Sequence, residues 1–339
     1  MRMLSSFPPW GEALLLSVIV EWENAGRIGA ERSERMLATL AGQLRALGPD
    51  GTRREIVFVY DPMAVAAETV ARAARLIGDA AAVQIVAAPG RFYYEQKNIG
   101  AARARGETLV FLDSDVIPEP GWLAAILAPL GRPGFAVSGG CTFVAGRGLY
   151  AAAMALAWFF PLRSAEGGVA PAKRFFANNV AFRRDIFLRF GFPETGQFRG
   201  QCTFLADALA RGGIAIASAR DARVAHPPPE GLGPFLRRAL RNGHDDWLRA
   251  RHRGQSGLRG IGALCGEYAR AIGRIVTDHR RAGLGPGGAA FALALASLYH
   301  GAKLGAYLAM PLRSRLHRIE APRYEASMTL PPAAPASRR

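Results

Sequence analysis

The sequence predicts an α/β protein with a mostly parallel, twisted sheet flanked by helices. From residue 14 onward, short runs of β-favouring apolar residues alternate with longer amphipathic segments, a pattern typical of parallel strands connected through helices. The apolar runs are continuous, as expected for strands that are buried on both faces. In sheets of this kind, ligands bind beyond the carboxyl ends of the strands.

The elements follow in order along the chain. Strands are expected where apolar residues run together, at residues 14–20, 54–60, 82–88, 108–112, 134–144 and 214–218. Helices are expected at residues 29–47, about 64–77, 95–106, 149–160, 179–190 and 202–212. The segment 29–47, GAERSERMLATLAGQLRAL, is amphipathic, and Gly106 closes the helix before the fourth strand. Residues 164–173, SAEGGVAPAK, are small and polar and are expected to be flexible.

Charge divides the chain of 339 residues, whose net charge is +16. Residues 232–339 contain 18 Lys and Arg against 6 Asp and Glu, a net charge of +12. We therefore predict an α/β domain over residues 1–231, a basic helical C-terminal extension over 232–330 and a disordered tail over 331–339. The three cysteines show no metal-ligand spacing, which is typical of a reducing, cytoplasmic setting.

The basic extension contains one strongly apolar segment, residues 287–310. It has 12 uncharged, mostly apolar residues up to Tyr299 before His300 and Lys303 interrupt it. A spanning helix needs about 20 apolar residues, so a helix in the plane of an anionic membrane surface fits the Arg-rich flanks better. The alternative is a buried core helix. Nucleic-acid binding is not expected, because few aromatic residues lie among the basic ones.

Acidic residues follow three of the expected strands. Glu21 and Glu23 follow the first, Asp61 the second, and Asp113 and Asp115 the fourth. Two carboxylates one residue apart repel each other unless a cation lies between them. A Mg²⁺ or Mn²⁺ ion that also bridges to substrate phosphates would neutralise them. The alternative is that both aspartates cap the following turn.

With these acids in place, residues 14–247 resemble the family 2 glycosyltransferases, which have the GT-A fold and a D-x-D motif. The segment KNIGAARARGETLVFLDSDVIPEPGWL matches that family at Asn98, Gly100, Ala101, Gly106, Asp113, Asp115 and Trp122. The segment ANNVAFRRDIFLRFGFPE supplies Asn179, the Arg183–Arg184 pair and Glu194, and DARVAHPPP supplies the family's late histidine as His226.

The resemblance implies a role for each of these residues. Glu21 and Asp61 would accept hydrogen bonds from a nucleobase and ribose while remaining solvated, and Lys97 would lie beside the nucleotide. Asp113 would contact the ribose and the metal. The implied ligands of Mn²⁺ or Mg²⁺ are Asp113, Asp115 and His226. The alternatives are a surface lysine at 97 and a structural histidine at 226.

The chain departs from the family where the general base belongs. The family's Gly-Glu-Asp triplet falls on Gly200, Gln201 and Cys202, and neither residue after the glycine is acidic. Glu194 is the nearest replacement candidate for the catalytic base. Asn179, Gln201 and Cys202 are placed on the acceptor side.

The resemblance implies a metal-dependent, inverting glycosyltransferase. It would transfer a sugar from a nucleotide-diphosphate sugar, a UDP-sugar, to an envelope glycan or lipid-linked acceptor, peripherally on the cytoplasmic face of a bacterial inner membrane. One alternative is a catalytically degenerate relative that binds sugar nucleotide as a scaffold. The other is a nucleotidyltransferase, which would need a phosphate-binding Gly/Arg loop after the first strand, where this chain has the acidic EWEN.

Overall fold

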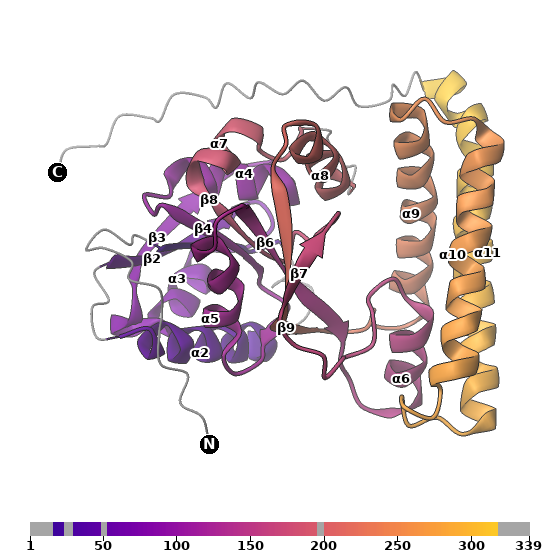
Figure 1. Ribbon diagram of the computed structural model, residues 1–339, viewed down its shortest axis with the longest axis horizontal. Helices are drawn as coiled ribbons and strands as arrows, with labels where there is room; N and C mark the ends of the chain where they lie inside the picture. Colours follow the sequence, from indigo (N-terminus) through magenta and orange to yellow (C-terminus); the bar gives the residue numbers. More distant parts are fainter. Residues whose placement is uncertain (1–15, 24–29, 49–52, 195–199, 318–339) are drawn as a thin grey trace.

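The computed structural model describes residues 16–23, 30–48, 53–194 and 200–317. It shows an α/β body beside a layer of long helices (Figure 1). The strands are β1 (Leu16–Glu21), β2 (Arg54–Tyr60), β3 (Ala82–Ala87), β4 (Thr108–Asp113), β5 (Ile117–Pro118), β6 (Phe135–Val144), β7 (Val169–Ala172), β8 (Asn179–Arg183) and β9 (Ala215–His226). The helices of the body are α2 (Ala30–Ala46), α3 (Ala67–Arg75), α4 (Tyr93–Arg103), α5 (Trp122–Leu127), α6 (Gly148–Ala157), α7 (Arg184–Phe190) and α8 (Gln201–Arg211). The layer consists of α9 (Leu232–His252), α10 (Gly257–Asp278) and α11 (Pro286–His317).

The sheet joins two parallel parts through one antiparallel strand. Its order is β3-β2-β1-β4-β8-β6-β9-β5, and β7 pairs with β9. Strands β1 to β4 are parallel, β8 is antiparallel to both β4 and β6, and β6 is parallel to β9. The predicted α/β class is confirmed. The sheet is mixed, because β5 and β7 also pair antiparallel with β9. The carboxyl ends of β1 and β4 lie side by side, with Glu21 paired to Asp113.

Each central strand is buried on both faces, which explains its continuous apolar sequence. In β1, Val18 and Val20 pack into the core under α2, α3 and α5, whereas Ile19 packs into the core under α4, α7 and α8. This alternation is the period of two of a strand. Helix α4 lies very close to β1, because a Cβ at Gly100 would be 2.5 Å from Ile19 Cγ2.

The helix predicted over residues 179–190 is wrong in its first half. Asn179–Arg183 forms β8, and only Arg184–Phe190 is helical. Val180, Ala181 and Phe182 are fully buried between β4 and β6. Pairing with strands distant in sequence therefore decides the conformation of a segment whose local pattern also suits a helix. The strand β9 extends the predicted 214–218 to His226.

The helical layer shares a hydrophobic core with α6. Trp158, Phe235, Ile275 and Tyr299 belong to this core, so the layer packs on the body although β9 ends near the predicted boundary at residue 231. Lys303, which interrupts the apolar segment of α11, is buried and lies 2.6 Å from Asp246 and 2.5 Å from Glu267. No helix in the described ranges is long and apolar enough to cross a membrane.

Candidate functional site

The carboxyl ends of β1, β4 and β9 bring the predicted acidic residues and His226 to one place. Arg32, on α2, holds the turn after β4 against the end of β9. Its Nε donates a hydrogen bond to the Asp115 carbonyl oxygen over 2.6 Å, and its Nη2 donates to the Ala225 carbonyl oxygen over 2.8 Å. Arg32 thus fixes the backbone beside Asp115 and His226, two residues far apart in the sequence.

Asp113 is neutralised by the chain itself. Lys97 Nζ lies 2.7 Å from Asp113 Oδ1, and Tyr93 Oη lies 2.7 and 2.8 Å from the two carboxylate oxygens. Burial raises the pKa of Asp113 and the Lys97 charge opposes that rise, leaving the pKa above its ordinary value. Tyr93 and Lys97 are four residues apart on α4, so both project from one helical face. The predicted surface alternative for Lys97 is wrong, because its side chain is fully buried.

Asp115 and His226 face each other without a shared proton. His226 Nδ1 lies 2.6 Å from the Pro227 carbonyl oxygen, and a carbonyl oxygen only accepts hydrogen bonds. Nδ1 therefore carries the proton, and the lone pair of Nε2 points toward Asp115 Oδ2, 3.7 Å away. Burial lowers the pKa of His226 to about 4, so the imidazole is neutral at pH 7.

This arrangement fits a divalent cation. Asp115 Oδ1 is buried and has no hydrogen-bond partner, and Oδ2 faces a second acceptor, His226 Nε2. A cation between the carboxylate and the imidazole would be bound by the lone pairs of both groups. Within the described residues, no three His, Cys, Asp or Glu side chains lie close enough to hold a metal together. The predicted three-residue ligand set is therefore not assembled, because Asp113 is directed to Lys97 and Tyr93.

A basic residue from the helical layer reaches the same place. The rings of Trp158 and Phe160 lie 5.5 and 5.0 Å from the His226 ring, and the Arg238 guanidinium of α9 lies 5.5 Å from the Trp158 ring. Burial raises the pKa of Asp115, and Arg238 is the strongest opposing charge. The sequence gives no local signal for Arg238 or Trp158, since their approach depends on how α9 packs beside α6.

The two carboxylates expected to bind the nucleoside differ in burial and in hydrogen bonding. Glu21 is fully buried and accepts a hydrogen bond from the Glu23 backbone N–H over 2.9 Å. Burial, followed by the Asp113 charge, raises the pKa of Glu21 well above its usual range. The expectation that Glu21 remains solvated is wrong, because β1 lies between β2 and β4. Asp61 is partly exposed and caps its turn, accepting a hydrogen bond from the Met63 N–H over 2.9 Å.

The predicted acceptor-side residues have different surroundings. Asn179 is fully buried, accepts a hydrogen bond from Trp122 Nε1 over 2.8 Å and donates one to the Ala222 carbonyl oxygen over 3.0 Å. Its amide therefore joins strands and α5. Gln201 begins α8, and its Oε1 is buried without a partner. Cys202 beside it is partly exposed, whereas Glu194 is exposed.

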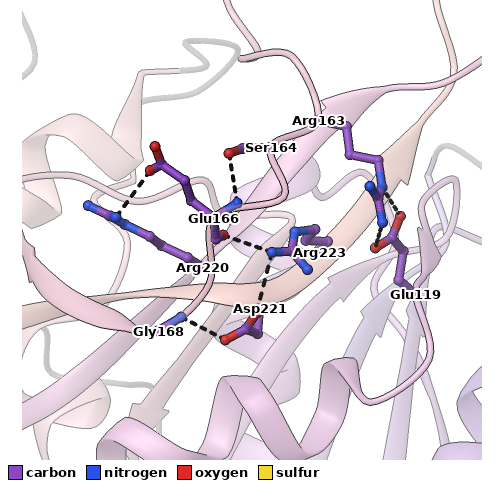
Figure 2. Close-up of polar contacts among 8 residues, drawn as sticks. All are labelled: Glu119, Arg163, Ser164, Glu166, Gly168, Arg220, Asp221 and Arg223. Carbon is purple, nitrogen blue, oxygen red and sulfur yellow. Dashed lines mark hydrogen bonds and ion pairs between the residues drawn. The ribbon is translucent and has the colours of Figure 1, made fainter.

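The segment expected to be flexible is tied to the body by polar contacts (Figure 2). Arg163 bonds to Glu119 beyond the D-x-D turn, at 2.6 and 3.1 Å. Arg223 of β9 donates to the Glu166 carbonyl oxygen over 2.8 Å, and Asp221 accepts the Gly168 N–H over 2.7 Å. These contacts hold the segment between Phe160 and β7 across β9 and close to the turn that carries Asp115.

Comparison with known proteins identifies a family over part of the chain. Residues 29–190 match the model of the family "Glycosyl transferase family 2". A search of curated proteins finds no match.

Solved structures resemble the fold over most of the chain. The mannosyltransferase PcManGT from Pyrobaculum calidifontis, in complex with GDP-Man and Mn²⁺, superposes with a TM-score of 0.56 at 20% identity, covering 90% of this chain and 88% of that one. S. aureus TarS 1-349, in complex with UDP-GlcNAc, superposes with a TM-score of 0.50 at 16% identity, covering 89% and 92%. The match over residues 29–190 and the fold together identify a family 2 glycosyltransferase domain with the GT-A fold in this chain.

Proposed function

We propose that this glycosyltransferase transfers a sugar from a nucleotide-diphosphate sugar, a UDP-sugar, to a glycan or lipid-linked acceptor, with metal dependence and inversion at the sugar. The observation that carries the proposal is the pair Asp115 and His226. Two buried groups that can only accept point at each other, at the carboxyl end of a sheet where ligands of such folds bind. The similar structures that contain GDP-Man with Mn²⁺ and UDP-GlcNAc support this class of donor.

Asp115 and His226 would hold Mn²⁺ or Mg²⁺, and the donor diphosphate would fill the remaining coordination positions. The bound ion would neutralise the diphosphate leaving group. Arg238 adds a fixed positive charge on the same side, stacked against Trp158, and this charge would act where negative charge develops. Arg32 keeps Asp115 and the end of β9 in register through its two carbonyl contacts.

The buried pair of Lys97 and Asp113 would prepare the nucleoside side of the site. The Lys97 ammonium keeps a buried carboxylate paired and fixed in one orientation. Asp113 would then offer its edge to the ribose. Glu21, paired in register with Asp113, and Asp61, at the end of the neighbouring strand, complete the nucleoside side. In this arrangement Lys97 acts through Asp113.

Proton removal from the acceptor is assigned to Glu194. Gln201 cannot take up a proton, and Cys202 offers a thiol where the family has a carboxylate. Glu194 is the exposed carboxylate before residues 195–199, and those five residues lie outside the described ranges. General base catalysis contributes about 10²- to 10⁴-fold, so a displaced base leaves a slow enzyme. The Gln201–Cys202 replacement also favours a second candidate function, a donor-binding protein without turnover.

The test is calorimetric binding of UDP- and GDP-sugars to the full chain, with and without Mn²⁺. We expect a UDP-sugar to bind at least tenfold more tightly with Mn²⁺. Asp115→Ala should remove that difference, whereas Asp61→Ala should weaken binding with and without the metal. Equal affinity with and without Mn²⁺ in the parent would contradict the proposed site. Binding of the donor without product in a transfer assay would favour the second candidate.

A further inference from the structure

Helix α11 carries an exposed apolar stripe along its length. The exposed residues recur at alternating spacings of three and four, and they are Phe291, Ala294, Leu298, Gly301, Gly305, Leu308 and Leu312. Such spacing places them on one face of a helix. Leu298, Leu308 and Leu312 are 44%, 54% and 64% exposed, values unusual for leucines of a packed bundle. The charged Lys303 is turned away from this face, into its contacts with Asp246 and Glu267.

A second stripe runs along α10. Its exposed members are Leu258, Gly262, Cys265, Ala269 and Val276, again at helical spacing. The Val276 and Leu258 side chains are 61% and 83% exposed.

An exposed polar contact joins α10 to α11. Tyr268 Oη and Ser297 Oγ share an exposed hydrogen bond of 2.6 Å between α10 and α11. Tyr268 directly precedes Ala269 of the α10 stripe, and Ser297 directly precedes Leu298 of the α11 stripe. We call the exposed stripes of α10 and α11 together the outer face.

The opposite side of the layer is attached to the body. Arg274 of α10 donates hydrogen bonds to the carbonyl oxygens of Trp158 and Phe160 over 2.6 and 3.4 Å. Phe204 of α8 packs against Trp247 of α9. In Figure 1, α10 and α11 accordingly lie farthest from the sheet. No described segment of the chain covers the outer face, since its members remain exposed.

An apolar groove indents the outer face near the start of α11. Its cavity of about 410 Å³ is lined mainly by Leu232, Phe235, Phe291, Ala294, Leu295 and Leu298. The lining is aliphatic and aromatic, and it runs directly into the α11 stripe.

Arginines border the apolar surface. Arg259 and Arg270 each follow a member of the α10 stripe, Leu258 and Ala269, and Arg237 lies on the exposed side of α9. Neighbouring helix residues are about 100° apart, so Arg259 and Arg270 lie at the edge of the α10 stripe. The four acidic residues between 232 and 317 are Asp245, Asp246, Glu267 and Asp278. Asp246, Glu267 and Asp278 form ion pairs within the layer, Asp245 is buried beside His244, and none of the four belongs to the outer face.

We propose that the outer face docks on an anionic lipid bilayer, with α10 and α11 lying in the interfacial plane and the groove receiving an acyl chain. Apolar side chains bordered by arginines suit the boundary between headgroups and acyl chains. A second copy of this chain fits less well, because face-to-face pairing would bring two arginine-bordered surfaces of like charge together. The inference deepens the proposed function by naming the surface that brings the enzyme to a lipid-linked acceptor.

The experiment is co-sedimentation of the full chain with vesicles of phosphatidylcholine alone or mixed with phosphatidylglycerol. The outer-face variants are Leu298→Asp, Leu308→Asp and Val276→Asp, and the border variant combines Arg237→Gln, Arg259→Gln and Arg270→Gln. Matched controls are Leu76→Asp and Arg75→Gln, an exposed pair at the C-terminal end of α3 of the body. Thermal unfolding and UDP-sugar binding are measured for every variant.

We expect the parent to bind the mixed vesicles in preference to phosphatidylcholine alone. Each arginine removed should lower the partition coefficient about fivefold, and each Leu→Asp change at least about tenfold. The α3 controls should bind like the parent, and all variants should keep parental donor affinity and melting temperature. Vesicle binding without donor binding in the parent would refute the proposed reaction and leave the docking surface standing.

Three outcomes would overturn the inference: no vesicle binding by the parent, equal binding by the outer-face variants, or a parental dimer in solution that Leu298→Asp converts to monomer. The last would identify a second copy as the occupant of the outer face.

Discussion

Lys97 Nζ lies 2.7 Å from Asp113 Oδ1 in an ion pair whose lysine is fully buried. The two aspartates of the D-x-D motif therefore differ in their partners. Asp113 has a cation supplied by α4, whereas Asp115 keeps an unpartnered buried oxygen and faces the neutral His226. Of the two carboxylates, Asp113 is therefore bound within the protein, whereas Asp115 is available to a ligand.

Removing Lys97 should destabilise the fold. Lys97→Met leaves Asp113 buried without its cation, and breaking a buried pair in this way costs about 3–5 kcal/mol. The double variant Lys97→Met/Asp113→Asn removes the orphaned charge and should recover part of that loss. Urea unfolding measures both. A double variant no more stable than the single one would show that the ion pair is not the cause.

Loss of His226 should remove metal-dependent binding while leaving the fold intact. His226→Ala and Asp115→Asn should each weaken Mn²⁺-dependent UDP binding at least about tenfold, because each removes one of the two metal ligands proposed among the described residues. Calorimetry with and without Mn²⁺ gives the difference. His244→Ala, a partly exposed histidine of α9, is the matched control. Metal dependence retained in His226→Ala would exclude the histidine from the site.

Arg238 should contribute to the binding of the donor diphosphate and not to the binding of the nucleoside. A hydrogen bond or ion pair to a charged group contributes about 1.5–3 kcal/mol, so Arg238→Gln should weaken UDP binding about 10- to 100-fold and leave uridine binding unchanged. Arg237→Gln changes the exposed neighbour and should bind UDP like the parent. Equal losses for UDP and uridine would mean that Arg238 acts on the fold of the site.

Glu55 should make stability depend on acid pH. Burial raises its pKa, but hydrogen bonds from Ser17, from the Arg105 backbone and side chain, and from Gln84 together lower it below its ordinary value. The unfolded pKa is about 4.3, so its contribution is fully present above that pH and is lost as pH falls through the lower folded value.

Glu55→Gln should therefore lower the free energy of unfolding by about 2 kcal/mol at pH 7, and the difference from the parent should shrink below about pH 4. Urea unfolding across this pH range measures it. Glu68→Gln, an exposed glutamate on α3, should have no such effect. A difference that stays constant down to acid pH would refute the ionised, hydrogen-bonded state of Glu55.

Substitutions at Glu194 and at the position of the family's triplet should identify the general base of the transfer reaction. Glu194→Gln should lower the transfer rate about 10²- to 10⁴-fold with unchanged donor affinity. Gln201→Glu/Cys202→Asp restores the family's acidic pair and should raise the rate above the parent. The measurements are sugar transfer and donor hydrolysis. Turnover confined to the restored variant would make the parent a binding protein, and an unchanged rate in Glu194→Gln would exclude Glu194.

Much of the fold follows from local sequence. The continuous apolar runs of β1, β2 and β4 identify buried parallel strands, because both faces of these strands must be apolar. The meeting of the strand-end acids at one place could be predicted as well, because parallel strands bring their carboxyl ends to the same edge of a sheet. These features, and the family they indicate, are properties of short segments.

Tertiary structure decided what depends on distant partners. Residues 179–183 became β8 because β4 and β6 flank them, and Lys97 became a buried partner of Asp113 because α4 packs directly on β1. Arg32 and Arg238 reach Asp115 and its surroundings from α2 and α9, and Lys303 turns inward to Asp246. The spacing of apolar residues in the sequence indicates which face of an element is buried. The charged partner of a buried polar group is determined only when separate elements pack together.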